Sequence, residues 1–329
     1  MKNIAVVILN WNGAQLLQQF MPSIIKYSSE LATIYVADNA STDESIAILK
    51  TAFPQVKIIS NSGNFGFAKG YNIALQQVHE PIYALVNSDI EVTPNWLDAP
   101  LFVLKNNSNV AVVQPKILNY NRKDYFEYAG AAGGYIDKYG YPFCRGRVFD
   151  SIEKDDGQYN DETEIFWASG ACFFIRNDVF KKLGGFDCSF FAHQEEIDLC
   201  WRAFNRGYKI KYTSKSTVYH VGGATLNESN PQKTYLNFRN SLLMLVKNVP
   251  KNKLFTILFI RMLLDGVAGI RFITNGKLSH FMAIIKAHLS FYRQLKTALT
   301  HNTGIKKQEY YRCKSIIFNY FIKNGKVFE

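Results

Sequence analysis

The feature that most constrains the fold is an alternation, over the first 120 residues, between short apolar runs and segments of helical periodicity. The runs are rich in β-branched residues and occupy residues 4–10, 34–39, 56–60, 83–87 and 110–117. Between the first two runs, apolar residues recur at helical spacing from Leu16 to Ile25. Short buried strands separated by helices are typical of an open sheet with helices on its faces. The sequence therefore predicts an α/β fold with a parallel sheet.

Two local motifs predict where helices begin. Ser41 followed by Glu44 has the spacing of a capping box, so we expect a helix to start there, after the second run. Thr93 and Pro94 suit the N-cap and the first position of the helix that follows the fourth run.

Residues 118–163 break this rhythm, because they are rich in glycine, tyrosine and acidic residues and follow neither period. We interpret them as long surface loops, which in compact domains are usually functional or mobile. Order returns in residues 166–176, a predicted strand that is followed by a short helix ending at Gly184. A helix to about Gly207 and two strand-like runs within residues 208–223 follow.

The net charge of +11 is distributed unevenly along the 329 residues. Residues 231–329 hold 17 Lys and Arg against 3 Asp and Glu, a net of +14, so residues 1–230 carry 21 against 24, a net of −3. A basic end beside a slightly acidic body points to an anionic surface touched by one part of the molecule. Nucleic acid is not expected as that surface, because the cations are spread among long apolar runs and do not line a polar face.

Residues 231–329 have a helical pattern, of which residues 254–273 are the most apolar part. Arg261, Asp265 and Arg271 interrupt this part, so a membrane-spanning helix is not expected. Two interpretations stay open. One is an amphipathic extension on an anionic membrane surface, and the other is a basic helical subdomain that only packs on the core.

The N-terminus and the cysteines bear on the compartment. The first apolar run is short and lacks a small-residue cleavage site, so we interpret it as a buried strand and not as a signal peptide. Five cysteines occur without a Cys-X-X-Cys motif, and an odd number argues against a disulfide framework. We expect reduced thiols in a cytosol.

Polar residues end the first two predicted strands. Asn10 and Asn12 lie in a turn that presents donors at the carboxyl edge of the sheet, where ligands bind in α/β folds. The second strand leads into Asp38 and Asn39, and the carboxylate can accept a hydrogen bond from an imide N–H or a ribose hydroxyl. Taken alone, each of these residues can equally be a turn former.

A glycine-rich stretch, residues 61–72, lies between a predicted strand and a helix. Its glycines, among them Gly66 beside Asn64, permit a close approach of the backbone to a ligand, and Lys69 can neutralise a diphosphate. The stretch is neither a Walker loop nor a dinucleotide fingerprint.

The fourth predicted strand ends abruptly in Asn87, Ser88 and Asp89. An acid at the end of a buried strand is often a turn or cap residue, but its oxygens also suit a hard cation such as Mg²⁺ or Mn²⁺. His220 ends a later strand-like run and is followed by two glycines. A lone histidine is usually structural, but beside Asp89 it becomes a candidate metal ligand, and imidazole suits Mn²⁺ better than Mg²⁺.

Three acids crowd the start of the helix that begins near residue 195. A solvated helix start is one interpretation, because acids there favour the positive end of the macrodipole. Glu195, Asp198 and Arg202 share one face, on which Asp198 and Arg202 can pair. Glu196 lies about 100° away from that face and has no obvious local cation. It is therefore the acid free to face a substrate.

Together these motifs resemble the family 2 glycosyltransferases, and their rhamnosyltransferase-like branch in particular. The likeness covers roughly residues 4–245, with eight motifs in the family's order: NWNG, DNASTD, GFAKGYN, NSD, SGACFFIR, GGFD, EEIDLCWR and YHVGG. It implies a GT-A fold, which is Rossmann-like with a mixed, mainly parallel sheet flanked by helices. It also implies inverting transfer from a nucleotide-diphosphate sugar, either dTDP-rhamnose or a UDP-hexose. The implied acceptor is a hydroxyl of a glycan or lipid-linked molecule in cell-surface polysaccharide synthesis.

The resemblance also assigns residues. It implies that Asp38 contacts the nucleotide base, that Asp89 takes the final position of the DxD metal motif with His220 completing the site, and that Glu196 stands at the catalytic base. The expected nucleotide-sugar-binding set is Asn10, Asn12, Asp38, Asn39, Asn64, Gly66, Lys69, Asn87 and Ser88, and the acceptor or supporting set is Trp167, Glu195, Asp198 and Arg202. The expected cofactor is a divalent cation, Mg²⁺ or Mn²⁺.

Two departures qualify the resemblance. Asn87 makes the first DxD position neutral, and Glu196 is a glutamate where the family more often has aspartate. Two rivals therefore stay open: a degenerate transferase that binds a nucleotide or glycan without catalysis, and a sugar nucleotidyltransferase, whose glycine-rich loop should follow the first strand.

The resemblance also predicts a domain organisation and a location. Residues 1–230 form the catalytic domain, with a donor-binding half of about 1–117 and an acceptor-binding half of about 118–230. Residues 231–329 form a basic amphipathic extension. We expect a cytoplasmic protein, peripheral on the inner membrane of a bacterium.

Overall fold

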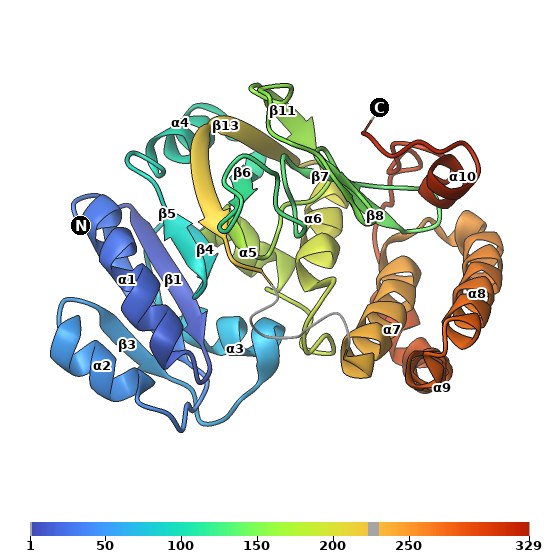
Figure 1. Cartoon of the computed structure of the whole chain (residues 1–329), viewed down its shortest axis with the longest axis horizontal. Helices are drawn as coiled ribbons and strands as arrows, with labels where there is room; N and C mark the ends of the chain where they lie inside the picture. The colour runs from blue at the N-terminus through green and yellow to red at the C-terminus, as the bar shows by residue number, and fades with distance from the viewer. Residues whose placement is uncertain (1, 223–229, 329) are drawn as a thin grey trace.

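A computed structural model describes residues 2–222 and 230–328 and contains one large mixed sheet (Figure 1). Its strands are β1 (Ile4–Asn10), β2 (Ala32–Asp38), β3 (Lys57–Ser60), β4 (Ile82–Asn87), β5 (Ile90–Val92), β6 (Val110–Asn119), β11 (Glu162–Ile165), β12 (Cys172–Arg176) and β13 (Lys209–His220). They are ordered β11-β13-β6-β12-β4-β1-β2-β3, with β5 paired to β13. The sheet is parallel from β4 to β3 and between β13 and β6, while β12, β11 and β5 are antiparallel to their neighbours. The predicted α/β mixed sheet is confirmed.

Both faces of the sheet are covered, as the apolar strands require. The helices between the strands are α1 (Ala14–Ser28), α2 (Ser45–Ala52), α3 (Gly66–Ala74), α4 (Asp98–Asn106), α5 (Asn177–Leu183) and α6 (Glu195–Asn205). Ile4, Val6 and Ile8 of β1 share a core with α1, α2 and α4. Ala5 and Val7, which point the other way, share a core with α3, α5 and α6.

Both predicted helix starts are wrong. The Ser41 hydroxyl donates to Asp38 Oδ1, and α2 begins only at Ser45, whose amide donates to the Asp43 carboxylate at 3.0 Å. Thr93 donates its hydroxyl to the Thr217 carbonyl at 2.7 Å, and α4 begins at Asp98 after a turn. In each case another partner, local for Ser41 and distant in sequence for Thr93, takes the side chain that the pattern assigned to capping.

The predicted surface loops are also wrong in part, because residues 118–163 contain a second small sheet. Its strands are β7 (Gly134–Ile136), β8 (Pro142–Cys144), β9 (Arg147–Val148) and β10 (Ser151–Ile152), in the order β10-β9-β8-β7. Gly134 packs on the Trp167 ring, and a Cβ at that glycine would lie 2.0 Å from Trp167 Cε2. Further along the chain, the two strand-like runs form one long strand, β13, with an irregularity between Thr213 and Thr217.

The C-terminal part is helical, as predicted. It comprises α7 (Pro231–Asn248), α8 (Lys251–Thr274), α9 (Leu278–Thr300) and α10 (Ile316–Phe321). Leu242 and Leu245 of α7 belong to the same core as the sheet. Figure 1 shows α8 at the end of the molecule opposite α2 and β3, and α7 nearer to the sheet than α8. Across the described ranges, no helix combines the length and apolarity needed to cross a membrane.

Candidate active site

The ends of β1 and β2 hold the Asp38 carboxylate in place. Their parallel register pairs Asn10 with Asp38, and Asn10 Nδ2 donates to Asp38 Oδ1 at 3.0 Å. The Ser41 amide donates to Asp38 Oδ2 at 2.9 Å. Asn10 is 1% exposed and Asp38 is 3% exposed, so a buried hydrogen bond from Asn10 fixes the position of the carboxylate. Ser41 was missed because the sequence pattern assigned it to a helix cap.

Asn12 joins the loops after β1 and β2. Its φ of 51° lies in the left-handed region that asparagine tolerates. Its backbone amide donates to Ser41 Oγ at 2.9 Å, and its side-chain Oδ1 accepts from the Thr42 backbone amide at 2.8 Å. The structure therefore gives Asn12 a loop-shaping role beside the predicted ligand.

The glycine-rich stretch contacts the segment that precedes α6. Gly66 has a φ of +71°, and a Cβ there would lie 2.4 Å from the Phe191 carbonyl oxygen. The next amide, that of Phe67, donates to the same oxygen at 2.8 Å. Asn39 donates to the Gly66 carbonyl at 3.0 Å, and Asn64 accepts from the Gly66 amide at 3.1 Å. Both asparagines therefore shape this loop.

Lys69 lies on the exposed side of α3, with its Nζ 4.3 Å from the centre of the Phe65 ring. Asn87 and Ser88, at the end of β4, are partly exposed. The Asn87 amide donates to the Ala171 carbonyl at 2.9 Å, which ties the end of β4 to the turn before β12.

Asp89 and His220 meet as predicted, and a third residue joins them. His220 Nε2 lies 3.1 Å from Asp89 Oδ1, and its Nδ1 lies 3.2 Å from Glu127 Oε2. Burial disfavours the charged imidazole, but the carboxylates of Glu127 and Asp89 outweigh it and raise the pKa of His220 to about 10. Glu127 was missed because it lies in the stretch predicted to be loop. Gly223, the second of the two predicted glycines, lies outside the described residues.

This cluster supplies donors that suit a divalent ion. Buried carboxylate oxygens and an imidazole nitrogen are ligands that Mn²⁺ accepts, whereas Mg²⁺ prefers oxygen alone. His220 Nδ1 lies 3.2 Å from Glu127 Oε2, outside the geometry of a well-formed hydrogen bond. In the described ranges, no three His, Cys, Asp or Glu side chains form a complete metal-binding group. Asp89 and His220 would therefore hold an ion only together with further ligands, such as those of a bound diphosphate.

Glu196 lies in the first turn of α6 beside Gly170. A Cβ at Gly170 would lie 3.7 Å from Glu196 Cδ, so the glycine leaves space next to the carboxyl group. The residue is partly accessible, but its Oε2 is buried and has no hydrogen-bond partner in the described part of the chain. Burial raises the pKa of Glu196 to about 7. Because Ala171, the next residue after Gly170, bonds Asn87, the acid lies near the end of β4.

Asp198 pairs with Arg202 as predicted, and with two residues of α7 as well. Arg202 Nε lies 2.7 Å from Asp198 Oδ2, while Lys247 Nζ lies 2.9 Å and Asn248 Nδ2 2.8 Å from Oδ1. Burial acts against the charge, but Arg202 and Lys247 hold the pKa of Asp198 well below its usual range. Glu195 is 4% exposed, and burial together with Glu196 raises its pKa. Glu195 and Glu196 therefore share a pKa raised by burial, whereas the pKa of Asp198 is lowered.

The turn before α6 is strained and is held by α7. His193 and Gln194 have φ values of 70° and 72°, in a region that costs such residues about 1–3 kcal/mol each. Asn240 of α7 donates to the carbonyls of Ala192 and His193 at 2.9 and 2.8 Å. Asn240 was missed because its partner is a backbone segment distant in sequence.

Trp167 supports the site from the core. It is 3% exposed, and its indole Nε1 donates to the Tyr135 carbonyl at 2.8 Å. Of the two roles predicted for this residue, support is the one that the buried ring favours. It does not form an exposed platform for an acceptor.

Sequence comparisons identify the class to which this fold and site belong. The profile described as "Glycosyl transferase family 2" matches residues 5–184, which is more than half of the chain. The chain belongs to this family and is a glycosyltransferase.

Two relatives illustrate the range of the family. N-acetylglucosaminyl-diphospho-decaprenol L-rhamnosyltransferase of Mycobacterium tuberculosis is 22% identical over 231 residues, covering 66% of this chain and 75% of the relative. The low-salt glycan biosynthesis hexosyltransferase Agl10 of Haloferax volcanii is 24% identical over 250 residues, covering 73% and 75%.

Solved structures share the fold. GalNAc-T7, crystallised with UDP, GalNAc and Mn²⁺, aligns with a TM-score of 0.63 at 17% identity, over 98% of this chain and 57% of that one. This chain thus spans little more than half the length of GalNAc-T7. TarS 1–349 of S. aureus, in complex with UDP-GlcNAc, aligns with a TM-score of 0.56 at 15% identity, over 100% and 93%. The fold is that of GT-A glycosyltransferases.

Proposed function

We propose that the protein is an inverting glycosyltransferase that moves a sugar from a nucleotide-diphosphate donor to a hydroxyl of a glycan or lipid-linked acceptor. The observation that carries this proposal is Glu196. Its carboxyl group has a pKa of about 7, a buried oxygen without a partner in the described ranges, and space beside Gly170. A general base works best when its pKa lies near the working pH.

The residues around Glu196 divide the remaining tasks. Asp38 offers a fixed acceptor to the nucleotide base, while Gly66, Lys69 and the end of β4 face the diphosphate. Asp89 and His220, with Glu127 beside them, would hold a divalent ion, Mg²⁺ or Mn²⁺, which stabilises the charge that develops on the leaving diphosphate.

Glu196 accepts the proton of the attacking hydroxyl as the new glycosidic bond forms and the bond to the diphosphate breaks. Attack on the face opposite the leaving group inverts the anomeric carbon, without a covalent intermediate.

The donor we propose is dTDP-rhamnose or a UDP-hexose, and the pathway is cell-surface polysaccharide synthesis. Support comes from the rhamnosyltransferase and hexosyltransferase named among the relatives and from the UDP-sugar complex of TarS. The M. tuberculosis relative, whose acceptor carries a diphospho-decaprenol group, supports a lipid-linked acceptor.

We further propose that the enzyme is cytoplasmic and binds peripherally to the inner membrane of a bacterium through residues 231–329. The support is an apolar face on α8 and α9 whose large side chains are at least 38% exposed. On α8 they are Phe255, Phe259, Leu263, Val267, Ile270 and Ile273, and on α9 they are Leu278, Met282, Ile285, Leu289, Tyr292 and Leu299. They recur at helical spacing among the cations of a segment with a net charge of +14, as interfacial helices do.

A donor screen tests the catalytic proposal. UDP-, dTDP- and GDP-sugars would be supplied with Mg²⁺ or Mn²⁺, and release of the nucleoside diphosphate would be followed. We expect turnover with a dTDP- or UDP-sugar. Absence of turnover and of any nucleotide-induced thermal shift across the panel would overturn the proposal.

A further inference from the structure

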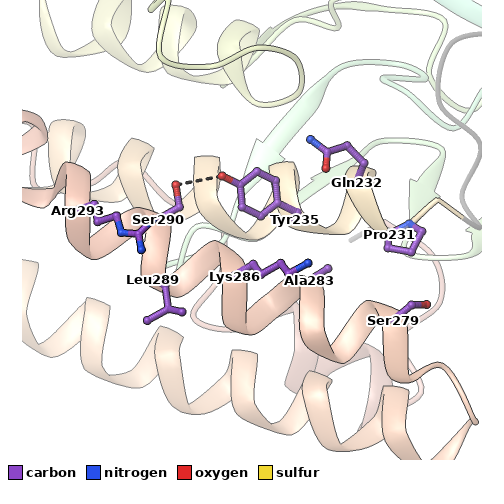
Figure 2. Close-up of a pocket in the computed structure, with 9 residues that line it drawn as sticks. All are labelled: Pro231, Gln232, Tyr235, Ser279, Ala283, Lys286, Leu289, Ser290 and Arg293. Atoms are coloured by element: carbon purple, nitrogen blue, oxygen red, sulfur yellow. Dashed lines mark hydrogen bonds between the residues drawn. The ribbon is translucent and has the colours of Figure 1, made fainter.

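A groove of about 450 Å³ lies between α7 and α9, and Asp38, Asp89, Glu196 and His220 do not line it (Figure 2). Its walls carry Gln232 and Tyr235 from α7, and Lys286, Leu289, Ser290 and Arg293 from α9. The groove is open to solvent and lies along the seam between two long helices. None of the residues assigned to donor binding or catalysis lines this groove.

The charge of the groove has one sign. Lys286 and Arg293 are separated by seven residues, nearly two turns, so they emerge on the same side of α9. The described residues of the lining include these two cations and no acid. An ammonium and a guanidinium without an acid between them are suited to phosphate oxygens.

Tyr235, on the opposite wall of the groove, is also affected by the positive charge of these cations. Its hydroxyl donates to Ser290 Oγ at 3.0 Å (Figure 2). Arg239 Nη1 donates to the Tyr235 oxygen at 3.3 Å. Partial burial acts to raise the pKa of Tyr235, but the bond with Ser290 and the cations Arg239 and Arg293 together lower it. The hydroxyls, the Gln232 amide and the two cations provide donors for an anion.

Two neighbours specify what kind of anion fits. Leu289 lines the groove and is also part of the apolar face, so the cationic groove opens beside a surface suited to a lipid chain. On the other side, Arg239, which bonds Tyr235, also donates to the Ser189 carbonyl at 3.0 Å. That carbonyl belongs to the segment leading into α6 and Glu196. The groove therefore lies between the apolar face and the segment that precedes α6.

We propose that this groove binds the phosphate or diphosphate group of a lipid-linked acceptor, whose lipid chain lies along the apolar face beside Leu289. The inference rests on the proposed function, since it names where the acceptor's anionic group is held. Anionic phospholipid head groups share the phosphate chemistry, so the experiment separates the two sources.

Binding of the full-length protein to two kinds of phosphatidylcholine vesicle tests the proposal. One kind contains a polyprenyl diphosphate, and the other contains phosphatidylglycerol at matched surface charge. The test variant is Lys286→Ala/Arg293→Ala. The matched control is Lys277→Ala/Lys296→Ala, which removes two exposed cations outside the groove, one at the N-cap of α9 and one within α9.

We expect the wild-type protein to prefer the polyprenyl diphosphate vesicles and the groove variant to lose that preference by about tenfold or more. The control should weaken binding to both kinds of vesicle alike and keep the preference. Equal effects of the two double variants, or an equal loss on both kinds of vesicle, would overturn the proposal. All four side chains are exposed, so folding should be intact, and thermal unfolding checks it.

The outcome is separable from that of the catalytic proposal. Failure to turn over any nucleotide sugar, with selective binding retained, would overturn the catalytic function and leave the groove as a lipid-diphosphate site. An active enzyme that binds both kinds of vesicle alike would overturn the groove alone.

Discussion

The carboxyl edge of the sheet, with the start of α6, buries carboxyl groups, whereas the apolar face of α8 and α9 exposes hydrocarbon groups. Asp89 after β4, and Glu195 and Asp198 in α6, are at most 5% exposed. On the apolar face, large hydrocarbon groups are open to solvent, with Phe255 83% exposed. Both arrangements are unfavourable for a chain alone in water. The difference fits the two ligands we propose, a nucleotide-diphosphate sugar at the sheet and a lipid surface at the helices.

A second contrast lies within the first turns of α6. Asp198 is buried with Arg202 and Lys247, so its charge is compensated. Glu196 lies two residues earlier in the helix, and the described residues give its Oε2 no partner. A compensated acid stabilises the fold, whereas an uncompensated one has a raised pKa and can exchange a proton. α7 contributes to both, through Lys247 and through Asn240, which holds the strained turn before the helix.

The largest expected effect comes from removing the uncompensated acid. Glu196→Gln should lower transfer by about two to four orders of magnitude, because the amide cannot accept the proton of the acceptor hydroxyl. Donor binding, measured by calorimetry, should be unchanged. The matched control is Glu195→Gln, the adjacent buried acid, which should change the rate by less than about tenfold. Equal losses from the two variants would contradict the assignment of the base.

The next effect concerns the compensated acid and the stability of the fold. Asp198→Ala takes the carboxylate partner from Arg202 and leaves Lys247 with Asp187, and it should lower the free energy of unfolding by about 3–5 kcal/mol. Denaturant unfolding measures the change. Glu91→Ala is the control, because it removes an acid from the exposed pair with Lys123 and should cost about 0–1 kcal/mol. Similar values for the two variants would show that α6 is not held by this pairing.

The smallest effect is expected at the apolar face. Phe255→Ser/Phe259→Ser should weaken binding to anionic vesicles roughly tenfold, because two exposed rings no longer enter the lipid. Vesicle co-sedimentation measures this, and donor turnover in detergent should be unaffected. Phe102→Ser on α4 is the control, since this ring is 68% exposed but lies on another part of the molecule. If the control weakens binding as much, the apolar face has no special role in membrane contact.

The sequence predicted those parts of the molecule whose signal lies within one element. The run at residues 4–10 coincides with β1, because each of its residues is apolar or ends the strand. The strands of the small sheet are two or three residues long, too short for an alternating pattern to stand out. The capping box failed because Ser41 found a stronger partner in the buried Asp38 carboxylate.

The candidate site divides in the same way. The pairing of Asp198 with Arg202 follows from helical spacing. Glu195, expected on the same face, instead shares with Glu196 a raised pKa and a buried Oε2 without a partner in the described ranges. Glu127 and Asn240 were not expected, since each acts on a partner that only the tertiary fold brings near. The extra cation on Asp198, Lys247, comes from α7, which the sequence assigned to a separate extension.

The pH dependence of kcat tests most directly the claim that burial prepares Glu196 as the base. Turnover would be measured at saturating donor and acceptor from about pH 5.5 to 9. Only the carboxylate accepts a proton, and burial raises its pKa to about 7, so kcat should fall as the pH drops through about 7 and level off above it. A rate that stays constant down to about pH 5.5 would contradict the account, because it would mean that the base titrates like a glutamate in water, near a pKa of about 4.3.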